Sequence, residues 1–234
     1  MKEVIHFLET LQVHNQREWF LAHKDDYLEA KNRFESFCLD LYDSLREADD
    51  TLGPLQPKDI FYRIYRDVRF SADKSPYKTH FGAFFCPEGR RSGYSGYYFQ
   101  VGAAGSGIYE NGHMLAVGNY WCDAKVLQTL REDILYGDDD FEAILHAADA
   151  RFSLDTEGAL KRVPKGFPED SPKADFLKLK NFCLCYQPDS NRFVTGPDLK
   201  GRTLELFASA TPFLQYVNRA VRLVKEESGL QPPR

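Results

Sequence analysis

The chain has 234 residues, with 30 basic and 35 acidic side chains and a formal net charge of −5. Hydrophobic residues make up 43% of it and charged residues 28%, which is typical of a folded globular protein and excludes a disordered or fibrous chain. The acidic balance also argues against a protein whose whole surface binds nucleic acid, while leaving room for a local basic patch.

The amino terminus does not resemble a signal peptide, because acidic residues interrupt its apolar stretch as early as Glu3 and Glu9. We expect no membrane span, since the longest uncharged run, 92–109, is rich in Gly, Ser and Tyr. Odd in number and irregularly spaced, the five cysteines indicate a reduced, cytoplasmic protein.

The first fifty residues are predicted to be helical. Asn15 to Glu18 resembles a capping box, in which Asn15 accepts a bond from the third amide and Glu18 reaches back. Further on, apolar side chains recur every three or four positions and form one stripe on a long helix. The stripe consists of Tyr27, Ala30, Phe34, Phe37, Cys38, Leu41 and Leu45. Residues 51–57, with one glycine and two prolines, are predicted to end this region.

Residues 58–117 have the composition of a sheet. The segment 60–70 is aromatic and β-branched, as strands are. Two further strands are predicted over 81–86 and 94–101, and the short turn between them implies antiparallel pairing. A fourth strand is expected over 107–117.

The remaining part, 123–228, is predicted to mix helix and strand. Asp123 is a candidate N-cap for one helix, and a second helix is expected over 138–150. Residues 182–186 form a further strand candidate. Thr211 is a candidate capping hydroxyl before a proline and opens a final helix with an apolar stripe.

Helices that flank an antiparallel sheet define the α+β class. The sequence therefore predicts an α+β protein with a helical N-terminal region and a C-terminal helix. We expect residues 1–234 to form a single domain.

A basic island interrupts this acidic chain. Residues 58–80 carry six basic and three acidic side chains, a net charge of +3, which leaves −8 for the rest. The charged residues are Lys58, Arg63, Arg66, Arg69, Lys74 and Lys78, with Asp59, Asp67 and Asp73. Such an island attracts anions, and the planar fork of arginine can hold a phosphate or carboxylate by two parallel hydrogen bonds.

The predicted strand separates the arginines. Arg63 and Arg69 would share one face. Arg66 would lie on the other, buried face with Tyr62, Ile64, Val68 and Phe70. A buried guanidinium is costly unless it is paired, so Arg66 needs a carboxylate, a carbonyl or a bound anion. We expect Asp67 to support Arg66, and Asp73 to bind nearby amides in a turn.

The loop after this strand completes the candidate site. Pro76 stiffens it, and it would present Lys74, Tyr77, Lys78 and His80 beside the arginines as a positively charged mouth. The predicted ligand is a small anion bearing phosphate or carboxylate, clamped by Arg63 and Arg69. Lys74 and Lys78 would supply further charge, and Tyr77 or His80 would line the mouth. No catalytic residue, metal ligand or cofactor is predicted.

Two other interpretations of the basic island remain open. It could dock nucleic acid or an acidic protein in a non-enzymatic adaptor, or it could be purely structural, with each arginine paired to a carboxylate of the protein itself.

Two smaller patterns lie outside the island. Cys183 and Cys185 would point to one side of their strand, as half-buried residues more than as a redox pair. The aromatic residues at 94–99 are most simply sheet packing, with base stacking as the alternative.

Several motifs resemble those of one family, the mostly bacterial domain-of-unknown-function family 2461, along the full length of the chain. They are Arg63–Ser71 (RIYRDVRFS), Asp73-Lys74, Pro76-Tyr77-Lys78, Trp19-Phe20 with His23-Lys24 and Tyr27, and Leu160–Phe167 with Leu177–Lys180. One departure is Val117-Gly118, where the family pattern has a Gly-Gly pair, and another is Cys122 in place of a proline. The resemblance implies family membership and no particular activity.

Overall fold

A computed structural model describes residues 1–106 and 110–229 of the chain and confirms the predicted α+β class. The helices are α1 (Lys2–Val13), α2 (Arg17–Ala22), α3 (Lys24–Ala48), α4 (Pro57–Ile60), α5 (Ala124–Tyr136), α6 (Phe141–Ala147), α7 (Ala174–Leu177), α8 (Arg192–Thr195), α9 (Leu199–Ser209) and α10 (Thr211–Glu227). The strands are β1 (His80–Phe85), β2 (Gly96–Gly102), β3 (Met114–Asn119), β4 (Ser153–Leu154) and β5 (Phe182–Tyr186).

The strands form one five-stranded sheet in the order β1-β2-β3-β5-β4, and every neighbouring pair is antiparallel. The predicted strands at 81–86, 94–101 and 182–186 are confirmed as β1, β2 and β5. Of the strand predicted over 107–117, residues 107–109 lie outside the described part. The described remainder becomes a strand only at Met114, because Gly112 takes a positive φ of 72° that breaks extended backbone.

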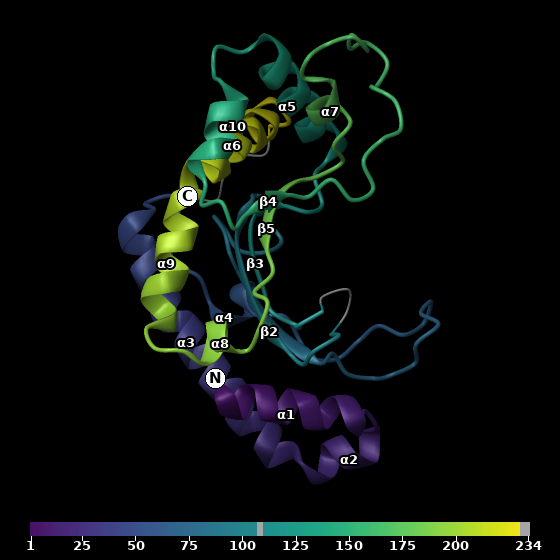
Figure 1. Cartoon of the computed structure of the whole chain (residues 1–234), viewed down its shortest axis with the longest axis vertical. Helices are drawn as coiled ribbons and strands as arrows, with labels where there is room; N and C mark the ends of the chain where they lie inside the picture. Colours follow the sequence, from purple (N-terminus) through teal and green to yellow (C-terminus); the bar gives the residue numbers. More distant parts are fainter. Residues whose placement is uncertain (107–109, 230–234) are drawn as a thin grey trace.

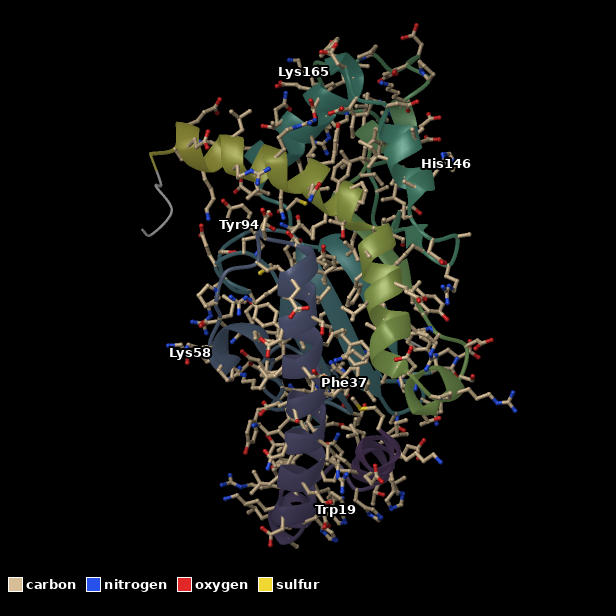
Figure 2. The ribbon with its side chains drawn as sticks, turned by 90° about the vertical axis from the view of Figure 1, so that its left-hand side faces the viewer. Trp19, Phe37, Lys58, Tyr94, His146 and Lys165 are labelled. Atoms are coloured by element: carbon tan, nitrogen blue, oxygen red, sulfur yellow. The ribbon has the colours of Figure 1, made fainter. Side chains whose placement is uncertain are left out.

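Helices cover one face of the sheet. Figure 2 shows α3 and α9 side by side in front of the strands, with Phe37 on α3. The apolar stripe predicted on the long helix is confirmed, and most of it is buried against the sheet. The strand side chains that meet these helices include Phe81, Phe85, Phe99, Val117 and Leu184. Because strand side chains alternate, the intervening residues point to the opposite face.

The opposite face of the sheet is open. In Figure 1 the helices α3, α4 and α9 lie on one side of the strands, and no helix of the described chain lies against the other side. Two irregular segments flank this open face. One is the arm, residues 61–79, and the other is the long loop that follows β4.

The strand predicted over 60–70 is wrong. Ile60 ends α4, and the rest of the segment makes only isolated bridges, at Phe61 and at Tyr65. The arm is a loose hairpin in which the Arg66 amide donates to the Pro76 carbonyl, 2.9 Å away. Its tip, residues 67–75, bonds to its own side chains instead of extending the ladder, a competition typical of Asp and Ser.

The predicted alternation of buried and exposed side chains therefore ends at the arm tip. Phe70, assigned to the buried face, is 97% exposed, while Ile64 is buried as expected. Arg66 is neither fully buried nor free, since its side chain is 25% exposed.

One of the three predicted helix caps is confirmed and two are wrong. Asp123 caps α5 as expected, accepting from the Lys125 amide. Asn15 does not cap α2, because its side chain donates to the Tyr77 carbonyl at 2.9 Å and accepts from the Tyr77 amide at 3.1 Å. Thr211 does not cap α10 either. Its hydroxyl donates to the Phe207 carbonyl one turn earlier, as in a continuing helix.

None of the helices in the described residues has both the length and the apolar character that a bilayer crossing requires.

Candidate functional site

The open face of the sheet forms the floor of a hollow of about 800 Å³. Strands β1, β2, β3 and β5 supply the floor, and the β1–β2 turn, the segment after β3 and the segment after β4 supply the rim. Small side chains make up part of the floor, namely Gly96, Ala116, Gly118, Cys183 and Cys185. Larger ones lie beside them, namely His80, Phe84, Tyr98 and Met114.

Close approaches explain one glycine of the floor, Gly118, and one glycine of β1, Gly82. A Cβ at Gly118 would lie 2.1 Å from the Phe182 carbonyl oxygen, and its φ of 132° disfavours other residues. A Cβ at Gly82 would lie 2.6 Å from the Tyr98 hydroxyl, so the Tyr98 side chain extends across β1. Close packing therefore requires glycine at both positions.

Cations gather at the β1 edge of this hollow. Lys78, Arg90 and Arg91 line it, and Arg63 joins them in a neighbouring hollow of about 740 Å³, so the four stand on a shared wall. We call Arg63, Lys78, Arg90 and Arg91 the edge cations. The Tyr62 ring lies among them, with Lys78 Nζ 5.5 Å and Arg90 Cζ 5.2 Å from its centroid.

The edge cations lack a neutralising acid within residues 1–106 and 110–229, where none of them forms an ion pair with a carboxylate. Arg90 Nε donates to the neutral carbonyl of Lys58, 3.3 Å away. Burial, followed by repulsion from Arg63 and Arg90, lowers the pKa of Lys78. None of these four charges is thus neutralised by an ion pair in the described chain, although Glu35 lines the same neighbouring hollow as Arg63.

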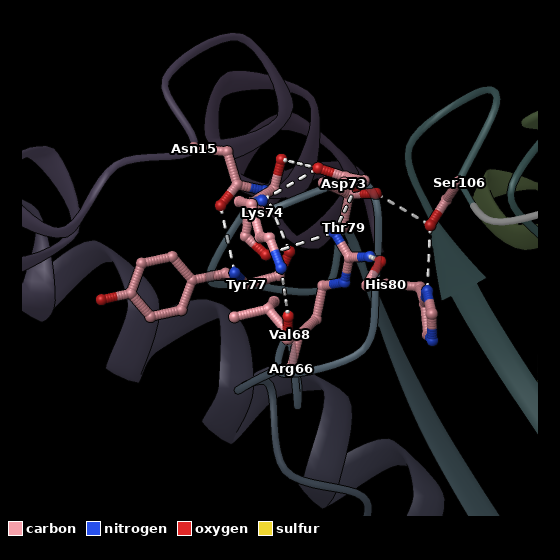
Figure 3. A network of polar contacts seen from close by, with 11 residues as sticks. Asn15, Arg66, Val68, Asp73, Lys74, Tyr77, Thr79, His80 and Ser106 are labelled. Carbon is pink, nitrogen blue, oxygen red and sulfur yellow. Dashed lines mark hydrogen bonds and ion pairs between the residues drawn. The ribbon is translucent and has the colours of Figure 1, made fainter.

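The arm tip contrasts with this edge. Arg66 Nη1 forms an ion pair with Asp73 and also donates to the Ser75 carbonyl at 3.2 Å, while Nη2 donates to the Ser71 hydroxyl at 3.3 Å (Figure 3). The expected carboxylate partner therefore exists, but it is Asp73 and not Asp67. Hydrogen bonds from Ser75, followed by the one from Arg66, lower the pKa of Asp73 to about 2.

The other two cations of the arm tip are also engaged locally. Arg69 grips Asp67 with two bonds, of 3.0 Å from Nε and 2.7 Å from Nη2. Lys74 donates to the Val68 carbonyl at 3.0 Å. None of Arg66, Arg69 and Lys74 lines the hollow in the described structure.

Tyr77 does not line the hollow either. Its ring is buried and stacks on Phe20, with the centroids 4.0 Å apart. Because Asn15 holds the main chain of the same residue, Tyr77 anchors the arm to the N-terminal helices.

His80 does line the hollow. Its Nδ1 lies 2.9 Å from the Ser106 hydroxyl, as Figure 3 shows. Burial, and then the charges of Lys78 and Arg66, lower the pKa of His80 to about 4. The imidazole is therefore neutral at pH 7 and adds no positive charge to the site.

Sequence reasoning missed Arg90 and Arg91, which it treated only as part of the turn between two strands. No local pattern could have found them, because the turn that carries them lies at the opposite end of β1 from Lys78. Lys78 and Arg90 come together only over the Tyr62 ring of the arm.

The cysteines of β5 lie on one side of their strand as predicted and line the floor, with the Cys183 and Cys185 sulfurs 3.7 Å apart and both thiols free. Cys183 is buried and not half-buried as expected. The hydrogen bond from Cys185, together with burial, raises the pKa of Cys183 well above its ordinary value. This thiol is thus protonated at neutral pH. Across the described residues, no three His, Cys, Asp or Glu side chains are grouped as a metal site would require.

The fold and the hollow define the class of the molecule. It is an α+β protein whose antiparallel sheet has helices on one face and, on the other, an open hollow with the edge cations on one side. Comparison with family models then identifies the family. The model described as "Conserved hypothetical protein (DUF2461)" matches residues 3–216, so the chain belongs to this family. Comparisons with curated proteins and with solved structures found no significant match.

Proposed function

We propose that the protein binds a small anionic ligand, bearing phosphate or carboxylate, at the β1 edge of the hollow. The observation that carries this proposal is the meeting of four cations without a carboxylate partner among the described residues, beside a hollow large enough for a small molecule. An anion placed among them would relieve the repulsion that lowers the Lys78 pKa.

The roles of the candidate residues change accordingly. Arg63 and Lys78 remain in the proposed site, and Arg90 and Arg91 take the clamping role first given to Arg69. His80 lines the mouth as a neutral hydrogen-bonding group. Arg66 with Asp73 fixes the arm, in the framework role expected of it.

The purely structural interpretation fits the arm tip, where each arginine has its own aspartate. It does not account for the edge cations. Because the five cysteines are unpaired, we also propose a reducing, cytoplasmic setting.

Calorimetric titration and thermal denaturation test the binding proposal, with pyrophosphate, citrate and ribose 5-phosphate as probes. At a hundred times its dissociation constant, a bound probe stabilises the native chain by about 2.7 kcal/mol. We expect one probe molecule per chain. We also expect a weak dependence on salt, whereas a nucleic-acid surface would lose affinity steeply as salt rises.

Two double variants make the test specific, because each removes two cations from the chain. Lys78→Met with Arg90→Met should abolish binding of the probes, and Arg69→Met with Lys74→Met should leave it unchanged. Equal behaviour of the two double variants, or a native chain that no probe stabilises, would contradict the proposal.

A further inference from the structure

The hollow presents aromatic surface that the anion proposal does not use. Trp121 lines it and is 85% exposed, and its neighbour Tyr120 is 49% exposed. A large exposed indole at the rim of a hollow is a mark of a binding surface, because burying its ring against a ligand is favourable.

The main chain at Trp121 is held close to the edge cations. Its amide donates to Asn119 Oδ1 at 2.9 Å, and Asn119 Nδ2 donates to the Gly93 carbonyl at 3.0 Å. Gly93 belongs to the β1–β2 turn that carries Arg90 and Arg91. The indole and these guanidinium groups therefore belong to the same end of the sheet.

The spacing between strands gives the approximate distance between Trp121 and the β1 edge of the sheet. Trp121 follows β3, which lies two strands from β1, and two strand spacings are about 10 Å. Between them the floor includes Gly96, Ala116 and Gly118, whose small side chains leave room for a flat molecule beside the Tyr98 ring. This separation suits a ligand whose ring and anionic group are joined by one sugar.

The far rim of the hollow has the opposite charge. Asp155 and Glu157, which follow the edge strand β4, line it there. A chain of phosphates that crossed the hollow would meet these carboxylates and be repelled. The charge distribution thus favours a ligand with one anionic end and an uncharged ring that carries hydrogen-bond donors.

We propose that the ligand is a nucleoside monophosphate, with its phosphate among Lys78, Arg90 and Arg91 and its base stacked on Trp121. This inference rests on the proposed function and adds the class of ligand. The base edge faces the acidic rim, where exocyclic amino groups can donate to carboxylates.

The chain contains two tryptophans, which allows a direct readout. In a Trp19→Phe background Trp121 is the sole indole, and a base stacked on it should quench its fluorescence. AMP is the probe, and ribose 5-phosphate is the matched control that carries the phosphate and sugar without the base. We expect AMP to quench Trp121 and to bind about tenfold more tightly than ribose 5-phosphate.

Substitution of the indole completes the test. Trp121→Ala should weaken AMP about tenfold and leave ribose 5-phosphate unchanged, while Trp121→Phe, which keeps a ring, should restore most of the loss. If AMP and ribose 5-phosphate bind equally and Trp121→Ala changes neither, the nucleotide inference is overturned while anion binding stands. If neither compound binds, the proposed function fails as well. A ten-nucleotide single strand that binds more tightly than AMP, with a steep loss at high salt, would overturn the inference in favour of a nucleic-acid surface.

Discussion

The arm tip and the β1 edge of the sheet both carry several cations, yet the fold treats them in opposite ways. At the tip, Arg66 and Arg69 are bound to Asp73 and Asp67 within the same short loop. At the edge, Lys78 and Arg90 both lie over the Tyr62 ring and have no acid within ion-pair distance in the described chain. Charge density along a sequence therefore does not locate a candidate anion site. Such a site depends on which cations remain without an ion-pair partner after folding.

Sequence spacing explains the difference. Asp67 precedes Arg69 by two positions, and the turn at the tip returns Asp73 to Arg66, so these pairs form from local geometry alone. The edge cations come from two separate segments that meet only when the arm and the β1–β2 turn lie beside β1. Their repulsion is a consequence of tertiary structure.

His80 is affected by both regions, because burial and then the charges of Lys78 at the edge and Arg66 of the arm lower its pKa. Its folded pKa of about 4 lies below the ordinary value of 6.5, so the unfolded chain binds the proton more tightly. The His80 contribution to stability is therefore fully present above pH 6.5, falls as the pH is lowered, and is lost below pH 4.

We expect this single group to remove about 3 kcal/mol from the free energy of unfolding across that range. Urea denaturation of the native chain and of His80→Gln at pH 7 and pH 4.5 measures it. The variant should show a shallower decline, and equal slopes for the two proteins would refute the assignment. The pKa of Asp73 is about 2, so its protonation does not contribute to the stability change between pH 7 and pH 4.5.

Asn15 allows the arm to be released from the body of the protein. Asn15→Ala removes both bonds to the main chain of Tyr77, and we expect a loss of about 2 kcal/mol in the free energy of unfolding. Hydrogen exchange at the Tyr77 amide should accelerate in the variant.

Asn15→Asp is the matched control, since it can still accept from the Tyr77 amide but cannot donate to the carbonyl. It should lose about half as much stability as Asn15→Ala. A full loss in Asn15→Asp, or none in Asn15→Ala, would show that these bonds do not anchor the arm.

The smallest effects are expected at the tip itself. Arg66→Ala should cost about 1 kcal/mol, because a half-buried guanidinium loses three partners. Arg69→Ala should be nearly neutral, since its side chain is 76% exposed and such ion pairs contribute little. Denaturant titration of both variants checks the order, and a larger loss for Arg69→Ala would reverse the interpretation.

Much of the fold could be predicted from the sequence, because periodic burial dictates it. The stripe on α3 and the strands β1, β2 and β5 follow from spacing alone. The strand predicted over 60–70 is wrong although its residues favour strands. At the tip of the arm, side chains of the same segment accept the backbone hydrogen bonds that a strand would make with its neighbour. That the chain is a single domain stays a prediction.

The candidate site was harder to predict. Lys78 and His80 were found because they are close in sequence to the arginines and also close in space to the hollow. Arg90 and Trp121 were missed because they reach it only through strand pairing. The local pattern around Asn15 predicts a helix cap. Its actual partner lies 62 residues away, where no local pattern can show it. Anion binding stays a prediction until it is measured.

The most direct measurement is an NMR titration of the Lys78 ammonium group with and without inorganic pyrophosphate. In the free protein its pKa should lie below the ordinary value of 10.5, and pyrophosphate should raise it by replacing repulsion with attraction. Lys74, whose ammonium group donates to a carbonyl of the arm tip, serves as the internal reference and should not respond. A Lys78 that titrates at the ordinary value and ignores pyrophosphate would contradict the existence of an uncompensated cationic site.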